Sequence, residues 1–140
     1  MPLSPFKAVF FDVGGTLIRV YPSVGDVYAR HARPFGYSGS VEVLNKGFGA
    51  QWKKMGGIES LRDQSGAEAE RKFWSELVYE VFKPLGGLNR FEEYFDLIFE
   101  EFRDKSNWRV YEDVIKSEIL EKLKKRGVVL GVISNWDSRL

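Results

Sequence analysis

The stretch FKAVFFDVGGTL, residues 6–17, decides how the rest of the chain is arranged. Residues 9–11 (Val-Phe-Phe) are β-branched or aromatic and predict a short, buried strand of a parallel sheet. Asp12 follows at the carboxyl end of this strand, where open α/β sheets bind their ligands. The Gly-Gly pair at 14–15 lets the backbone turn sharply and bring N–H groups close to an anion, and Thr16 adds a hydroxyl donor.

This pattern has two interpretations. Strand, carboxylate, glycine turn and hydroxyl together favour a carboxylate nucleophile that faces a phosphate or a similar electrophile. The alternative is a strand that ends in a glycine turn capped by Asp12, with no chemistry attached. A single stretch of this kind does not decide between the two.

Composition indicates a globular protein without a surface for nucleic acid or membrane. The chain has 140 residues, of which 44% are hydrophobic and 29% charged, and its net charge is +1. A charge this small gives no basic surplus for nucleic acid, and no apolar run approaches the ~20 residues of a membrane span. The absence of cysteine excludes disulfides and thiolate catalysis and fits a reducing compartment. We therefore expect a cytoplasmic protein.

The middle of the chain predicts a helical insertion. Apolar residues recur at helical spacing in four stretches, and glycine or proline follows each of the first three. Ser23 is a predicted N-cap, with Asp26 placed as its partner in a capping box. The aromatic stripes of these stretches, and the four tryptophans of the chain, are typical of packing rather than of a cofactor site. The predicted helices cover residues 24–33, 41–55, 67–83 and 91–104.

The last third of the chain repeats the layout around Asp12. Residues 112–126 predict one helix after a short connector, and residues 128–133 predict a second buried strand. Ser134 and Asn135 follow at its carboxyl end. Because a right-handed crossover makes the two strands parallel, both carboxyl ends lie at one edge of the sheet. We therefore expect Asp12 and Ser134 to face one crevice, where the hydroxyl donates to a phosphoryl oxygen.

These residues resemble the motifs of the haloacid dehalogenase-like (HAD) hydrolases. The first HAD motif is a hydrophobic strand followed by Asp-x-Asp-Gly-Thr-Leu; Asp12 matches its nucleophile, and residues 15–17 match its tail. Gly14 stands where the second aspartate, the general acid and base of the family's phosphatases, is usual. Ser134 matches the second motif, a hydrophobic strand plus Ser or Thr. Residues 108–114 and 132–140 are most similar to the Reg-2-like branch of the family.

The resemblance implies an α/β fold, with a Rossmannoid parallel-sheet core and an inserted α-helical bundle cap. Residues 1–21 and 106–140 would form a partial core, and residues 22–105 the cap. In the family, a lysine (motif three) and an acidic pair (motif four) follow the second motif, and nothing after Leu140 supplies them. We therefore expect a chain truncated after motif two, with weak activity of its own and the option of a homodimer through exposed core surface.

The resemblance also implies Mg²⁺-dependent hydrolysis of a small phosphomonoester. Asp12 would attack phosphorus and form an aspartyl-phosphate, and the Asp12 carboxylate and the Gly14 backbone carbonyl would ligate Mg²⁺. The residues expected to hold the phosphoryl group are Gly15, Thr16, Ser134 and Asn135.

Two other functions stay open at this point. A 2-haloacid dehalogenase would use Asp12 on carbon without a metal; the Ser134-Asn135 pair resembles that branch, but Gly14 stands where it has Tyr. A non-catalytic fragment or interaction module of HAD origin is the second. Arg19 and Tyr21, which follow motif one, are further candidates for substrate contact.

Overall fold

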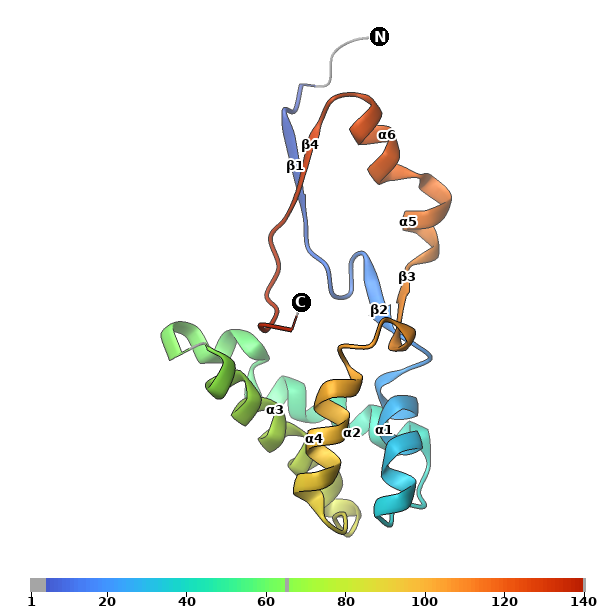
Figure 1. The fold of residues 1–140 in the computed structure, drawn as a ribbon, viewed down its shortest axis with the longest axis vertical. Coiled ribbons are helices and arrows are strands. Elements are labelled where there is room, and N and C mark those ends of the chain that lie inside the picture. Colours follow the sequence, from blue (N-terminus) through green and yellow to red (C-terminus); the bar gives the residue numbers. More distant parts are fainter. Residues whose placement is uncertain (1–4, 65, 140) are drawn as a thin grey trace.

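The computed structural model describes residues 5–64 and 66–139. It is mixed α/β, with a two-stranded parallel sheet at one end and a bundle of helices at the other (Figure 1). Strands β1 (Ala8–Phe11) and β4 (Val129–Val132) form the parallel pair. This arrangement confirms the predicted fold class, α/β with a parallel-sheet core and an inserted α-helical bundle.

The parallel pair joins the two ends of the described chain. Ala8 is in register with Val129, and Phe11 with Val132. The ladder continues beyond β4, because the Ile133 amide donates a hydrogen bond of 3.0 Å to the Phe11 carbonyl. As a result, Asp12 and Ser134 leave the sheet at the same edge, as the sequence predicted.

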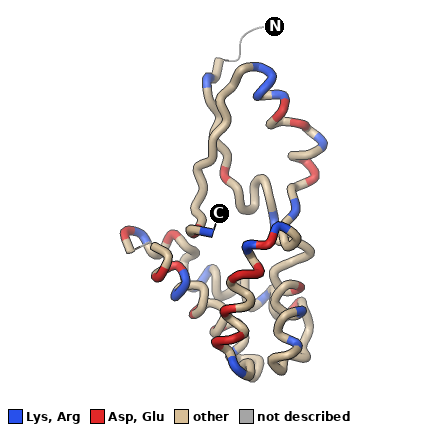
Figure 2. Tube along the Cα trace, in the orientation of Figure 1, with Lys and Arg blue, Asp and Glu red and all other residues tan. Residues whose placement is uncertain are grey.

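The prediction that both strands are buried is wrong. Phe10 is 59% exposed and Ile133 is 69% exposed, and only Val13 and Val128, which flank the strands, are buried in this region. β1 and β4 contain no charged residue, whereas charges are spread over the helices (Figure 2). Apolar strands of parallel sheets are normally covered on both faces. In the described part of the chain, neither face of this pair receives a full cover.

Helices α1 (Val24–Ala32), α2 (Val41–Met55), α3 (Ala67–Phe82) and α4 (Phe91–Glu101) form the bundle. The N-cap predicted at Ser23 is confirmed, because the Asp26 amide donates to Ser23 Oγ over 3.1 Å. The Asp26 carboxylate accepts from Ser23 Oγ over 2.5 Å, and not from the Ser23 amide as a capping box requires. The hydrophobic core lies inside this bundle and not in the sheet. Its buried residues are Val27, Tyr28, Ala29, Ala32, Phe35, Tyr37, Leu44, Phe73, Leu77, Val78, Val81, Phe82, Tyr94, Phe95 and Ile98.

A short antiparallel pair links the bundle to the parallel strands. β2 (Ile18–Val20) pairs with β3 (Trp108–Val110), so that the chain enters and leaves the bundle side by side (Figure 1). The sequence predicted only a connector at residues 108–111, because three residues show no clear alternation. The pair fixes where the bundle sits relative to the turn after β1.

Two further predictions need correction. The helix expected over residues 112–126 is two helices, α5 (Glu112–Ser117) and α6 (Ile119–Lys125), because Glu118 adopts a left-handed conformation (φ 52°) that breaks the helical hydrogen bonds. The sequence also predicted a loop over residues 58–66, but residues Ile58–Gln64 form 3₁₀ turns with a kink at Arg62 (φ 46°). Shorter 3₁₀ turns span Arg33–Phe35, Lys83–Leu85 and Lys105–Asn107. Among the described helices, none has the length and apolar character needed to cross a membrane.

Candidate active site

The side chains of Asp12 and Ser134 meet at the carboxyl ends of β1 and β4. Ser134 Oγ donates a hydrogen bond of 2.6 Å to Asp12 Oδ1, and the Val13 amide donates to the same oxygen over 2.9 Å. Thr16 Oγ1 donates to Asp12 Oδ2 over a longer 3.3 Å. The bond from Ser134, followed by that from Val13, lowers the pKa of the Asp12 carboxyl below its usual value. Asp12 is therefore an exposed carboxylate that stays ionised at neutral pH.

The carbonyl of Val13 accepts most of the backbone hydrogen bonds that close the turn after Asp12. Val13 O accepts hydrogen bonds from the amides of Thr16, Leu17 and Ile18, at 3.2, 2.8 and 3.1 Å. Gly15 has φ 78°, in the left-handed region that glycine adopts without strain. The turn holds the backbone of residues 13–16 in a fixed position beside the Asp12 carboxylate.

Close packing against Trp136 requires glycine at position 14. A Cβ built on Gly14 would lie less than 3.0 Å from Cζ3 of the Trp136 indole, closer than real carbon contacts. Trp136 is itself held by the Trp108 ring, with 5.2 Å between ring centroids. The indole therefore fills the space that a side chain at position 14 would need.

A cavity of about 780 Å³ opens in front of Asp12. Its walls come from the turn after β1, from the segment after β4, and from all four helices of the bundle. The bundle side is aromatic: Phe48 stacks on Trp52 (6.0 Å, 23°), and Trp52 stacks on Trp74 (5.6 Å, 27°). The cavity is therefore a polar site at the strand ends with a large apolar wall opposite.

The structure brings together most of the residues singled out in the sequence. Asp12, Gly14, Gly15, Ser134 and Asn135 line the cavity, whereas Thr16 reaches the site only through its bond to Asp12. Asn135 Nδ2 donates a hydrogen bond of 2.8 Å to Oε1 of Glu59, which also lines the cavity.

The candidates near the entrance of the bundle behave differently. Arg19 lines the cavity, and its guanidinium lies 5.3 Å from the Tyr21 ring centre. Tyr21 does not line the cavity; Arg109 covers its ring at 4.5 Å. His31, the one histidine of the chain, is engaged inside the bundle: Nδ1 lies 2.9 Å from the Val27 carbonyl, and Nε2 lies 3.3 Å from the Glu101 carboxylate.

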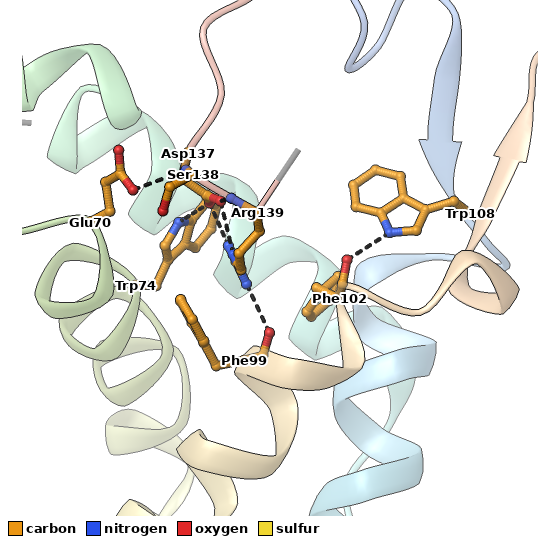
Figure 3. A network of polar contacts seen from close by, with 8 residues as sticks. All are labelled: Glu70, Trp74, Phe99, Phe102, Trp108, Asp137, Ser138 and Arg139. Atoms are coloured by element: carbon orange, nitrogen blue, oxygen red, sulfur yellow. Dashed lines mark hydrogen bonds and ion pairs between the residues drawn. The ribbon is translucent and has the colours of Figure 1, made fainter. Parts of the chain in front are cut away.

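A buried ion pair ties the segment after β4 to the bundle (Figure 3). The Asp137 carboxylate accepts hydrogen bonds from Arg139 Nε and Nη2, at 2.9 and 2.5 Å, and from the Trp74 indole at 2.7 Å. Arg139 Nη1 donates to the Phe99 carbonyl over 3.0 Å, and its guanidinium lies 4.0 Å from the Phe99 ring centre. The Ser138 amide donates to the Glu70 carboxylate over 2.9 Å. The strand that carries Ser134 is thereby fastened to α3 and α4.

Sequence reasoning missed this network and Glu59. The run Trp-Asp-Ser-Arg directly after Ser134-Asn135 carried the only available signal, since a carboxylate and a guanidinium two residues apart can pair. The partners Trp74 and Phe99 lie in helices distant in sequence, so only the packed structure identifies them.

The carboxylate and carbonyl oxygens at the site are suitable ligands for a hard cation such as Mg²⁺. The Asp12 carboxylate and the Gly14 carbonyl border the same cavity, and within the described residues the Gly14 carbonyl accepts no hydrogen bond. Mg²⁺ prefers oxygen ligands and is commonly bound by one or two carboxylates, with waters and substrate phosphates completing its shell. Within residues 5–64 and 66–139, no group of three or more His, Cys, Asp or Glu side chains forms a complete protein metal site.

Comparison with known proteins agrees with these motifs. The model of the haloacid dehalogenase-like hydrolases matches residues 6–139. The haloacid dehalogenase-like hydrolase domain-containing protein 3 of Danio rerio is 26% identical over 138 residues, which are 97% of this chain and 56% of that protein. Its Homo sapiens counterpart is 26% identical over 137 residues, 96% of this chain and 53% of that protein.

A relative from another animal group completes the comparison. The Rhythmically expressed gene 2 protein of Drosophila melanogaster is 26% identical over 145 residues, 99% of this chain and 56% of that protein. The chain thus spans about half the length of the curated relatives it matches. With the family model matching nearly all of its residues, the chain belongs to the haloacid dehalogenase-like hydrolases, in their Reg-2-like branch.

Proposed function

We propose that this chain carries the nucleophile of a Mg²⁺-dependent phosphomonoesterase, with Asp12 as the attacking carboxylate. The observation that supports this proposal most strongly is the 2.6 Å hydrogen bond from Ser134 Oγ to Asp12 Oδ1, at the shared edge of two parallel strands. It places a hydroxyl donor and an ionised carboxylate together in the wall of a cavity large enough for a small substrate.

The two carboxylate oxygens of Asp12 differ in their hydrogen bonds, and we propose different roles for them. Oδ1 accepts two bonds, from Ser134 and Val13, which orient the carboxylate. Oδ2 accepts only the longer bond from Thr16 and is the freer oxygen, so we assign it the attack on phosphorus. Attack forms an Asp12–phosphoryl bond and breaks the bond between phosphorus and the leaving oxygen. Water then hydrolyses the acyl phosphate and regenerates the carboxylate.

Donors near Asp12 would hold the charged phosphoryl oxygens. Once Oδ2 bonds to phosphorus, Oδ1 becomes a neutral carbonyl oxygen, and Ser134 Oγ turns from it toward the phosphoryl group. The Gly14 amide adds a donor, because within the described residues it makes no hydrogen bond. When bound, Mg²⁺ would supply positive charge against the phosphoryl oxygens. Its ligands from this chain would be the Asp12 carboxylate and the Gly14 carbonyl.

The proposal can be tested with beryllium fluoride, a phosphoryl mimic. In the presence of Mg²⁺, ¹⁹F NMR should show a bound fluoroberyllate signal with the full chain and none with Asp12→Asn. Hydrolysis of p-nitrophenyl phosphate should likewise depend on Mg²⁺ and be lost in Asp12→Asn. Asp63→Asn serves as the matched control, because it makes the same change at an exposed carboxylate that does not line the cavity.

Other outcomes would identify the alternative functions. Halide release from a 2-haloacid without added Mg²⁺, and without phosphate release, would indicate a dehalogenase. Identical behaviour of the wild-type chain and Asp12→Asn in the binding and both activity assays would indicate a non-catalytic module. Either result would overturn the proposal.

A further inference from the structure

Hydrolysis of an alkyl phosphate needs a proton donor for the leaving oxygen, and the Gly14 side of the site has none. The Trp136 indole fills the space where a side chain at position 14 would stand. We propose that Glu59, on the bundle side of the cavity, is the general acid and base of this site. The proposal rests on the phosphomonoesterase function proposed above and adds a catalytic residue to it.

The cavity wall offers few groups for this role. Among the described lining residues there is no histidine or lysine, and the carboxylates are those of Asp12, Glu59 and Asp137. Asp12 already has the role of nucleophile in the proposed reaction, so it cannot also be the acid. Asp137 is buried and accepts hydrogen bonds from Arg139 and Trp74 at both oxygens, so it is an ionised carboxylate with no proton to give to a substrate. Glu59 is the remaining carboxylate.

Short local contacts hold Glu59 at the edge of the cavity. Its 3₁₀ segment begins where α2 ends, and the Gly57 carbonyl accepts hydrogen bonds from both the amide and Oγ of Ser60, at 3.1 and 2.7 Å. Ile58, on the other side of Glu59, packs against the core of the bundle. The backbone on both sides of Glu59 is therefore anchored, although the side chain itself is exposed.

Asn135 connects Glu59 to the nucleophile. Its amide group donates to Glu59 Oε1 over 2.8 Å, while the preceding residue, Ser134, donates to Asp12 over 2.6 Å. Two consecutive residues after β4 thus contact the two carboxylates, one on each side of the cavity. Asn135 bonds only Oε1 of Glu59, and within the described residues Oε2 accepts no hydrogen bond, which leaves Oε2 for the leaving group.

The proton balance of the reaction is complete with Glu59. In the first step the protonated Glu59 carboxyl gives its proton to the leaving alkoxide oxygen while Asp12 Oδ2 bonds to phosphorus. In the second step the Glu59 carboxylate takes a proton from water as the water oxygen attacks phosphorus. Phosphate leaves, Asp12 is again a carboxylate, and Glu59 again carries its proton. General acid–base catalysis of this kind is worth about 10²–10⁴-fold in rate.

The test compares two leaving groups in the full chain. Glu59→Gln keeps the oxygen that accepts from Asn135 but cannot transfer a proton. An alkyl phosphate, whose alkoxide needs protonation, should lose about 10²-fold or more of its Asp12-dependent turnover. The burst of p-nitrophenolate should keep its rate, since that leaving group departs without a proton, while later turnover slows.

A matched control and the contrary results complete the design. Asp63→Asn neutralises an exposed carboxylate of the same 3₁₀ segment outside the cavity, and should leave both substrates unaffected. If turnover depends on Asp12 but Glu59→Gln retains its alkyl phosphate rate, Glu59 is not the acid, and the phosphomonoesterase proposal survives. If no turnover depends on Asp12, both proposals are wrong.

Discussion

The Trp74 indole nitrogen donates a 2.7 Å hydrogen bond to Asp137 Oδ2 and thereby joins α3 to the segment that follows β4 (Figure 3). The Arg139 guanidinium completes this contact, since it pairs with Asp137 and lies over the Phe99 ring. The segment after β4, which contains Ser134, is therefore held against the bundle by residues three to five positions after Ser134. We call this contact of Asp137 and Arg139 with Trp74 and Phe99 the β4–bundle link.

Removal of one charge should open the β4–bundle link. Asp137→Asn leaves the Arg139 guanidinium, whose side chain is 9% exposed, without its carboxylate. Breaking a buried ion pair in this way costs about 3–5 kcal/mol. Local opening of the terminal segment relieves this cost, so hydrogen exchange at the Trp74 indole and the Ser138 amide should accelerate about 10²-fold or more.

An exposed ion pair of the bundle is the control for this experiment. Arg71 and Asp96 form an ion pair on the surface, and the Asp96 side chain is 66% exposed. Exposed pairs contribute about 0–1 kcal/mol, so Asp96→Asn should leave exchange of the Trp74 indole unchanged. Equal exchange in Asp137→Asn and the wild-type chain would show that the link does not hold the segment.

The β4–bundle link should weaken in acid. Burial raises the pKa of the Asp137 carboxyl, but the hydrogen bonds and charge of Arg139 and the bond from Trp74 outweigh it, so that the pKa lies below its usual value. Because the opened segment then binds a proton more readily than the closed one, stability rises with pH in this range. The contribution is complete above about pH 4 and is lost as pH falls through the lowered pKa.

Exchange or fluorescence of Trp74 between pH 6 and pH 2 measures this dependence. Because other carboxyls also titrate between pH 6 and pH 2, the informative quantity is the difference in Trp74 exchange rate or fluorescence between the wild-type chain and Asp137→Asn. The difference should be constant above pH 4 and shrink below it. A difference that grows as pH falls would contradict the assigned direction of the pKa.

Removal of the Ser134 hydroxyl should raise the pKa of Asp12. The bond from Ser134 Oγ is the largest cause of the lowered Asp12 pKa, and the bond from Thr16 is the smallest of the lowering contacts. Titration of the ¹³C-labelled Asp12 carboxyl by NMR should therefore show a rise in Ser134→Ala and a smaller rise in Thr16→Val. Equal values in the two variants would mean that Ser134 does not act on Asp12 in solution.

A methyl group at position 14 should destabilise the chain only while Trp136 is present. Gly14→Ala forces its Cβ against the indole, and such overpacking costs about 1–3 kcal/mol. In a Trp136→Ala background the same change should be nearly neutral, which denaturant unfolding of the four proteins in a double-mutant cycle would show. Gly49→Ala in α2 is the control, because its Cβ meets no heavy atom within 4 Å. Additive effects of Gly14→Ala and Trp136→Ala would refute the contact.

Local sequence determined much of the fold. The N-cap at Ser23, the glycine that ends α2 and the aromatic stripes of α3 and α4 all depend on residues within a few positions of each other. For that reason the four bundle helices were predicted nearly within their bounds. The order of strand, aspartate and glycine turn likewise fixed Asp12, Gly14 and Gly15 at the end of β1. The roles assigned to these residues in chemistry stay predictions.

Tertiary structure alone decided the rest, because those features depend on partners far apart in the chain. How exposed β1 and β4 are depends on which other segments of the fold pack over them. The pairing of β2 with β3 joins residues about 90 positions apart, and such short strands give no periodic signal in the sequence. Trp74 meets Asp137, Glu59 meets Asn135, and Trp136 fills the space beside Gly14 only once the bundle and the strands are packed together. Sequence thus determined the four bundle helices and the position of Asp12 at the end of β1, and packing determined which side chains surround Asp12.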